Sequence, residues 1–189
     1  MSVKSKINPA LIKLWFCISL LYISCKPSLK TENYILCADP GLSSKGELIL
    51  YKNRPFTGII YAMYSVKDTL FYETYKEGLL QGPSKKWYPN QKPSEELFFN
   101  NGYYDGLQRG WWENERNRFL TRYRNKQLEG LSEFWYPSGM RKRNNYYKNG
   151  KEEGIQTQWG IDGRPHLSYE IKNGSIITIF RTKNCVYVQ

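Results

Sequence analysis

The sequence predicts an all-β fold: an elongated, single-layer antiparallel sheet built from about five 24-residue β-hairpin repeats. Three observations predict it: a regular glycine interval, turn-forming residues at two fixed places in each interval, and a high aromatic content. A repeat of this length is typical of proteins assembled from one supersecondary unit. The repeating glycines, each 24 residues after the one before, are Gly58, Gly82, Gly106, Gly130 and Gly154.

Aromatic residues make up 16 % of the 189 residues, whereas all hydrophobic residues together make up only 40 %. Aromatic side chains suit strands and half-buried surfaces, so this composition favours an extended sheet over a round apolar core. Tryptophan recurs five residues after the glycine, and we interpret it as a packing residue rather than one that stacks on a ligand. The tryptophans in question are Trp87, Trp111, Trp135 and Trp159.

Residues 82–105 illustrate how one repeat is expected to fold. A strand-like run ends near Trp87, residues 89–91 have turn chemistry, and a second strand-like run ends at Asn101-Gly102. Asn-Gly between two such runs is a strong hairpin signal, because a type I′ turn needs positive φ at both central residues. Each repeat is therefore predicted to contain two strands and two turns, and successive hairpins should continue one sheet.

The repeating glycine falls inside a predicted strand, where glycine weakens pairing unless a bulge or a close approach requires it. We expect it to make room for an aromatic ring of a neighbouring repeat. The pattern decays at both ends, since Met63 stands at the first tryptophan position and Thr178 at the sixth glycine position. Residues 175–189 are predicted to close the sheet as C-terminal strands.

Two stretches carry a family resemblance. Residues 147–154 read Tyr-Lys-Asn-Gly-Lys-Glu-Glu-Gly, and residues 133–139 read Glu-Phe-Trp-Tyr-Pro-Ser-Gly. Both resemble the units of MORN repeats in a bacterial variant, and the resemblance covers about residues 48–174. It implies a twisted single-layer sheet and a role in protein interaction or scaffolding. It carries over no catalytic residues, because fold analogy does not transfer activity.

Residues 1–24 are predicted to be a secretory signal, with three lysines before an apolar run that ends at Ile23. The run is shorter than the roughly 20 residues that a membrane-spanning helix needs. It leads into Leu-Tyr-Ile-Ser-Cys, which resembles the lipobox of bacterial lipoproteins, although Tyr22 is larger than the usual residue. The resemblance implies cleavage after Ser24 and lipid attachment to Cys25. The alternatives are a plain signal peptide and a hydrophobic anchor helix.

The predicted organisation has four parts: a signal peptide at 1–24, a lipidated N-terminus and flexible tether at 25–47, a MORN-like repeat domain at 48–174, and closing strands at 175–189. Export permits a disulfide between Cys37 and Cys185. A linear stack would hold these residues much farther apart than the roughly 7 Å between Cα atoms that a bridge allows. We therefore do not expect the bridge unless the tether folds back.

The sequence offers little catalytic chemistry. His166 is the single histidine, without the ligand spacing of a metal site, and no nucleophile elbow or phosphate loop is present. The acidic pairs at 95–96 and 152–153 should point to opposite faces of a strand, which does not suit paired acid–base work. We predict no enzymatic activity, no cofactor and no metal.

Positive charge is the main feature that the repeat does not explain. The net charge is +11, and the three lysines of the signal leave +8 on the remainder. The basic stretch suits an anionic envelope component or an acidic protein, and interleaved aromatic residues also describe single-stranded nucleic-acid binders. Export argues against nucleic acid, while edge charges can also simply prevent sheet aggregation. The basic stretch comprises Arg116, Arg118, Arg122, Arg124, Arg141, Lys142 and Arg143.

These observations predict a non-enzymatic lipoprotein of the bacterial cell envelope. It would be held at a membrane through Cys25 and present its sheet to a protein or an envelope surface. The alternative is an intracellular, antitoxin-like protein that binds and neutralises a toxin.

Overall fold

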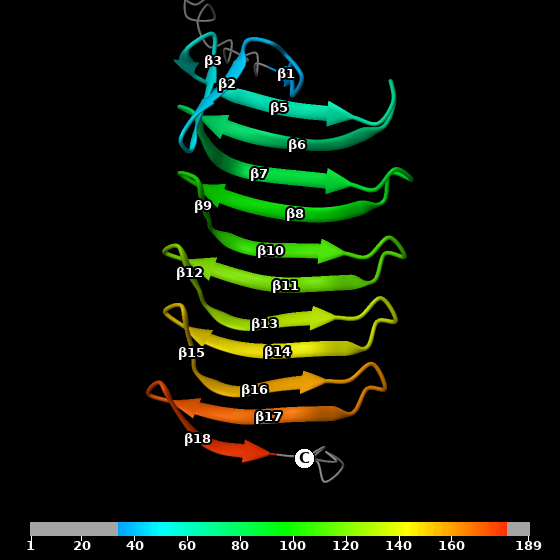
Figure 1. Cartoon of the computed structure of the whole chain (residues 1–189), viewed down its shortest axis with the longest axis vertical. Coiled ribbons are helices and arrows are strands. Elements are labelled where there is room, and N and C mark those ends of the chain that lie inside the picture. Colours follow the sequence, from blue (N-terminus) through cyan, green and yellow to red (C-terminus); the bar gives the residue numbers. More distant parts are fainter. Residues whose placement is uncertain (1–33, 181–189) are drawn as a thin grey trace, which may run out of the picture. The chain divides into compact units, whose positions relative to one another are not determined.

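The computed structural model describes residues 34–180, which form a large sheet of stacked hairpins and a small accessory sheet (Figure 1). The predicted all-β class and the single layer of successive antiparallel hairpins are confirmed. Within the described residues, no helix is long and apolar enough to cross a membrane. The predictions for the signal peptide, Ser24, Cys25, Cys185 and residues 181–189 fall outside the described part of the chain.

Each hairpin of the large sheet pairs a first strand with a second one. The first strands are β5 (Gly58–Met63), β7 (Leu79–Trp87), β10 (Gly106–Trp111), β13 (Gly130–Trp135) and β16 (Gly154–Trp159). The second strands are β6 (Thr69–Lys76), β8 (Pro93–Asn100), β11 (Asn117–Arg124), β14 (Arg141–Lys148) and β17 (Pro165–Lys172). Short strands follow three of the tight turns: β9 (Tyr103–Tyr104), β12 (Gln127–Leu128) and β15 (Lys151–Glu152).

From the second repeat on, each first strand pairs with fewer residues of the preceding repeat than of its own hairpin partner. In the third repeat β10 pairs with β11 from Gly106↔Tyr123 to Trp111↔Asn117, with a register shift just before Trp111. Toward the preceding repeat, β10 and β8 share only the pairs Arg109↔Glu96 and Gly110↔Glu95. Adjacent repeats are therefore joined by a short ladder and need other contacts to hold them together.

The tight turns behave as predicted. Asn101 and Gly102 have φ of 50° and 81°, and Asn149 and Gly150 have φ of 50° and 78°. Positive φ at both central residues is what a type I′ turn requires. In Figure 1 these turns lie on the side of β9, β12 and β15, and the longer turns lie on the opposite side.

The explanation predicted for the repeating glycine is wrong. A Cβ atom on Gly82, Gly106 or Gly130 would meet nothing within 4 Å, so no ring needs the space. These residues have φ of 88°, 70° and 78°, a left-handed conformation that side-chain-bearing residues rarely adopt. The glycine is required because the chain makes a left-handed kink there, within β7 and at the start of β10 and β13. Close approach occurs instead at Gly110, where an added Cβ would collide with the ring of Phe119.

The side chains on the two faces of the large sheet differ in how far they are buried. We call the side that carries the second residue after each repeating glycine the buried face, and the opposite side the open face. After the first repeat, the buried-face position is polar in every repeat and almost without solvent contact. It is occupied by Ile60, Ser84, Gln108, Ser132 and Gln156, which are between 1 % and 6 % exposed.

Two glutamines on the buried face substitute for missing backbone pairing. Gln108 Oε1 accepts from the backbone N–H of Phe98 at 2.9 Å, and its Nε2 donates to the carbonyl oxygens of Phe98 and Asp105 at 3.1 and 2.8 Å. Gln156 makes the equivalent bonds to Tyr146 and Glu153. Each amide thus acts as a strand partner where the ladder between two repeats is interrupted.

The two sides of the stack carry further bonds between repeats. On the longer-turn side, an aromatic side chain donates to the backbone carbonyl of the next repeat's tryptophan: Tyr88 to Trp111 at 2.9 Å, and Tyr136 to Trp159 at 3.0 Å. On the tight-turn side, Gln81 Oε1 accepts from the N–H of Asn101 at 2.9 Å. These bonds lock consecutive hairpins in register.

The apolar core is confined to the N-terminal end. Its buried cluster contains Ile35, Phe56, Ile60 and Tyr75, with Leu42 and Ile49 among the residues packed against it. Four strands precede the repeats: β1 (Tyr34–Leu36), β2 (Leu42–Lys45), β3 (Leu48–Tyr51) and β4 (Arg54–Pro55). β1 runs parallel to β5, while β2, β3 and β4 form the accessory sheet.

This cap corrects the predicted flexible tether. Strands β1 and β2 lie within residues 25–47, so ordered structure begins before the expected boundary at residue 48. The cause is apolar packing: Ile35 is only 8 % exposed, and Leu42 contacts the same cluster. Cys37, which follows β1, is an exposed free cysteine.

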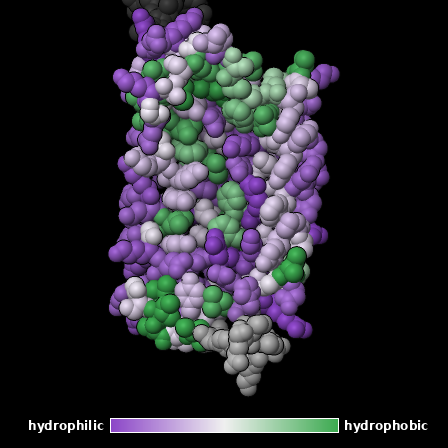
Figure 2. Space-filling view, viewed as in Figure 1, coloured by the Kyte–Doolittle hydropathy of each residue, from purple (hydrophilic) through white to green (hydrophobic). Residues whose placement is uncertain are grey.

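The other end of the sheet is β18 (Ser175–Phe180), which pairs with β17. It is the last strand in the order of the large sheet, and Ile176, Ile177 and Ile179 are all more than half exposed. Figure 2 shows apolar side chains gathered near the N-terminal end and around the last strands, with hydrophilic side chains along both lateral edges.

We predict that Gly106→Ala lowers the free energy of unfolding by about 1–2 kcal/mol, because alanine must adopt a left-handed conformation. Gly106→Asn should cost less, since asparagine tolerates that region better. Chemical denaturation of both variants measures the difference. Equal stability of the alanine variant and the wild type would contradict the backbone explanation.

We predict that Gln108→Leu costs about 3 kcal/mol, because it leaves the buried N–H of Phe98 without the side-chain acceptor it has now. Gln127→Leu, at an exposed position of β12, is the matched control and should stay within about 0.5 kcal/mol of wild type. Urea unfolding curves compare the two. If both variants unfold at the same denaturant concentration, the amide does not hold the repeats together.

Candidate functional site

The structure divides the basic stretch between the two faces of the sheet. Arg122 is paired with Leu107 and Arg124 lies two residues further along the same strand, so both belong to the open face. Arg143 is paired with Phe134 on one side and Gln158 on the other, which places it on the buried face. The seven basic residues therefore do not form one patch.

Three of the seven make hydrogen bonds or ion pairs within the sheet. Arg116 Nη1 donates to the carbonyl oxygens of Pro137 and Ser138 and thereby joins two longer turns. Arg118 Nη2 lies 2.6 Å from Glu95 Oε1, and Arg141 Nη2 lies 3.6 Å from Glu133 Oε1. These contacts give Arg116, Arg118 and Arg141 structural roles, which weakens the case for them as partner-binding residues.

A mixed cationic and apolar surface lies on the open face. Leu131, Tyr146 and Ile155 belong to it and are 42 %, 49 % and 57 % exposed. Leu131 and Tyr146 are cross-strand partners, and Ile155 is the equivalent of Leu131 one repeat later. We call this surface the open-face patch, and its residues are Leu131, Tyr146, Ile155, Arg122, Arg124, Lys148 and Lys172.

The open-face patch has four cations, and Glu170, the cross-strand partner of Ile155, lies on the same face. Arg122, Arg124, Lys148 and Lys172 are all exposed, and none of them takes part in the ion pairs formed among residues 34–180. Lys148 and Lys172 were not among the predicted site residues. Their signal was available in the sequence, because both precede an Asn-Gly turn by one residue at the same position of the repeat.

A pocket of about 310 Å³ lies between the fourth and fifth repeats. We call it the repeat-junction pocket. Lys142 Nζ lies 5.6 Å from the ring centre of Tyr136, and Arg143 Cζ lies 4.3 Å from that of Phe134. The pocket brings together two members of the predicted basic stretch. Its lining residues are Phe134, Tyr136, Lys142, Arg143, Gln158, Trp159 and His166.

Beside Arg143, a carboxylate and two phenols form a hydrogen-bonded group. Glu152 accepts from Asn145 Nδ2 at 2.9 Å and from the Tyr169 hydroxyl at 3.3 Å. Burial, followed by the negative charge of Glu152, raises the pKa of both Tyr147 and Tyr169. These phenols therefore stay protonated and act as hydrogen-bond donors near neutral pH. In the apolar cap, burial and the hydrogen bond to Glu73 raise the pKa of Tyr75 in the same way.

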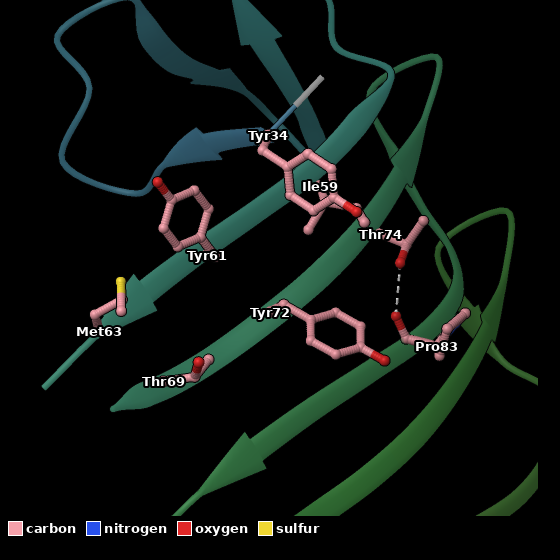
Figure 3. A pocket seen from close by; sticks show the side chains of 8 residues that line it. All are labelled: Tyr34, Ile59, Tyr61, Met63, Thr69, Tyr72, Thr74 and Pro83. Atoms are coloured by element: carbon pink, nitrogen blue, oxygen red, sulfur yellow. Dashed lines mark hydrogen bonds between the residues drawn. The ribbon is translucent and has the colours of Figure 1, made fainter. Parts of the chain in front are cut away.

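A larger open groove of about 710 Å³ lies at the N-terminal end (Figure 3). Tyr34 and Tyr72 project over it, and Met63 lies toward its far end. Thr74 Oγ1 donates to the carbonyl of Pro83 at 2.9 Å, the bond drawn in Figure 3. The lining has no charged side chain, so this groove lacks the electrostatic character of the open-face patch. Sequence reasoning missed it because Tyr34 was assigned to the tether.

The four repeat tryptophans lie at the ends of their strands and are half-buried. Trp87 packs against Tyr72 with ring centres 5.7 Å apart, and Trp159 forms part of the repeat-junction pocket. Their backbone carbonyls accept the aromatic hydrogen bonds between repeats described above. Among residues 34–180, no cluster of three or more acidic, histidine or cysteine residues is arranged to hold a metal ion.

No protein-family model matches this chain, and no curated protein matches it. The functional assignment therefore rests on the geometry of the open-face patch and the repeat-junction pocket.

Proposed function

We propose that the chain is a non-enzymatic lipoprotein of the bacterial cell envelope whose MORN-like sheet binds an anionic envelope surface. The observation that carries the proposal is the open-face patch. It combines exposed Leu131, Tyr146 and Ile155 with four exposed cations that have no ion-pair partner among the described residues.

The chemistry of the patch suits an interface with an anionic surface. Unpaired cations attract anions at long range, and grouped apolar side chains favour contact once the surfaces meet. The ion pairs of the second and third repeats show the contrasting arrangement. There Glu96 lies 2.8 Å from Lys85 and 3.1 Å from Arg109, so both cations have an ion-pair partner within the sheet.

The proposed anchor would keep the sheet close to the membrane. Cys25 precedes Tyr34 by nine residues, and a fully extended chain of that length spans at most about 30 Å. Anchoring would raise the effective concentration of the patch at the same membrane, so a weak individual contact would suffice.

The anchor predicts incorporation of a fatty-acid analogue into the full chain in bacterial cells, with the label in the membrane fraction. Cys25→Ala removes the attachment atom and should abolish labelling, whereas Cys37→Ala, at an exposed free cysteine, should leave it unchanged. An unlabelled wild-type chain that stays in the cytoplasm would overturn the anchor and favour the antitoxin-like alternative.

The patch predicts binding of the full chain, in detergent-free vesicle suspensions, to vesicles that contain anionic phospholipid. Arg122→Glu with Lys148→Glu should weaken this binding by about tenfold or more, because each cation near such a surface contributes about 1 kcal/mol. Lys45→Glu with Arg164→Glu is the matched control, since it makes the same charge change at exposed sites away from the patch.

Cosedimentation at two salt concentrations measures both variants. Equal loss of binding in the two double variants would show that total charge, rather than the patch, is responsible. No binding of the wild type to anionic vesicles would overturn the anionic surface as the partner.

A further inference from the structure

The repeat-junction pocket contains a cation that lacks the partner found at an equivalent junction. Two repeats earlier, Glu95 occupies the position that Arg143 holds here, and it lies 2.6 Å from Arg118 and 3.3 Å from Lys86. Both cations at that junction therefore have Glu95 as an ion-pair partner. At the junction of the fourth and fifth repeats, neither Arg143 nor Lys142 takes part in an ion pair among the described residues.

The guanidinium of Arg143 is fixed and incompletely bonded. It lies over Phe134 with 4.3 Å between Cζ and the ring centre, and its buried Nε has no hydrogen-bond partner. A half-buried cation without a counter-charge costs free energy, part of which a carboxylate at the accessible side of the guanidinium would recover. Arginine binds carboxylates through two parallel hydrogen bonds, and a pre-oriented guanidinium loses little freedom when it does so.

The other walls suit a ring that carries hydroxyl groups. Trp159 and Tyr136 supply aromatic surface, and Tyr136 is held in place by the hydrogen bond to the Trp159 carbonyl. Gln158 and His166 supply groups that can donate to or accept from hydroxyls. The volume of about 310 Å³ lies at the lower end of ligand pockets, which suits a single ring rather than a large ligand.

We infer that the repeat-junction pocket binds an acidic monosaccharide unit, with Arg143 and Lys142 on its carboxylate and Trp159 against its ring. A free sugar acid and an acidic residue within a glycan share this chemistry. The site is separate from the open-face patch, because Arg143 belongs to the buried face, and it does not depend on lipid anchoring.

The test is calorimetric titration of the full chain in detergent with glucuronate, glucose and inorganic phosphate. Glucuronate should bind, and glucose should bind at least about tenfold more weakly because it lacks the charge that the arginine recognises. Arg143→Gln should weaken glucuronate binding by about tenfold or more. Arg54→Gln makes the same charge change at an exposed residue of β4, outside both the pocket and the open-face patch, and should leave binding unchanged.

A second variant distinguishes loss of the binding site from misfolding of the Arg143→Gln variant. Lys142 is exposed, so Lys142→Gln should fold normally and still weaken glucuronate binding. Tryptophan fluorescence gives an independent readout, because glucuronate should change the emission of wild type but not of Trp159→Phe. No binding of glucuronate, or equal binding by the Arg143, Lys142 and Arg54 variants, would overturn the site. Phosphate binding as tight as glucuronate would overturn the assignment to a sugar.

A glycan that contains glucuronate distinguishes the two sources of the ligand. Tighter binding of the glycan than of the free sugar acid would support a residue within a chain. Tighter binding of the free acid would support a soluble ligand. Binding of either one in the pocket, with the predicted loss in Arg143→Gln, supports the inference.

Discussion

The structure depends on how one hairpin is joined to the next. Between the second and third repeats only two residue pairs link β8 to β10, so the backbone groups around Phe98 need other partners. The side chain of Gln108 supplies them, and Gln156 does the same for Tyr146 two repeats later. Because a buried backbone N–H without an acceptor is costly, these amides decide whether neighbouring hairpins stay together. The left-handed glycines serve the same junction, since each of them kinks the chain two residues before a buried side chain.

In most small domains one core both buries apolar side chains and holds the secondary-structure elements together, whereas here different parts of the sheet do so. Apolar burial occurs at the N-terminal cap, where Phe56 and Tyr75 pack against strands that precede the repeats. The later repeats rely on hydrogen bonds between consecutive hairpins, with polar residues at their most buried positions. The outer faces and edges of the later repeats therefore do not have to pack against a core. The open-face patch and the repeat-junction pocket both occur in this later part of the sheet.

Sequence reasoning predicted the hairpins because their signals are local: Asn149-Gly150 needs only its own two residues to favour a type I′ turn. It found the glycine interval but gave the wrong cause, since spacing does not reveal the sign of φ.

From the sequence alone, polar residues such as Gln108 and Ser132 are expected at the surface, and only the pairing of strands shows that they are buried. Ile35 was missed because its strand, Tyr34–Leu36, has only three residues, too few to show an alternation. The sequence shows where the basic residues lie along the chain but not in space, because alternation in strands sends Arg122 and Arg143 to opposite faces. The repeat-junction pocket joins residues of four strands, and no interval within one repeat predicts it.

The contacts between repeats have fixed sequence separations. Tyr88 reaches Trp111 and Tyr136 reaches Trp159, each 23 residues ahead, and the tight-turn bonds from Gln81 and Glu129 each reach a residue 20 positions ahead. A duplicated segment of 24 residues would therefore find every one of these partners already in place, without any change to the cap. Growth or loss of whole units during evolution would lengthen or shorten the sheet by one hairpin at a time, while sites at a particular junction diverge independently.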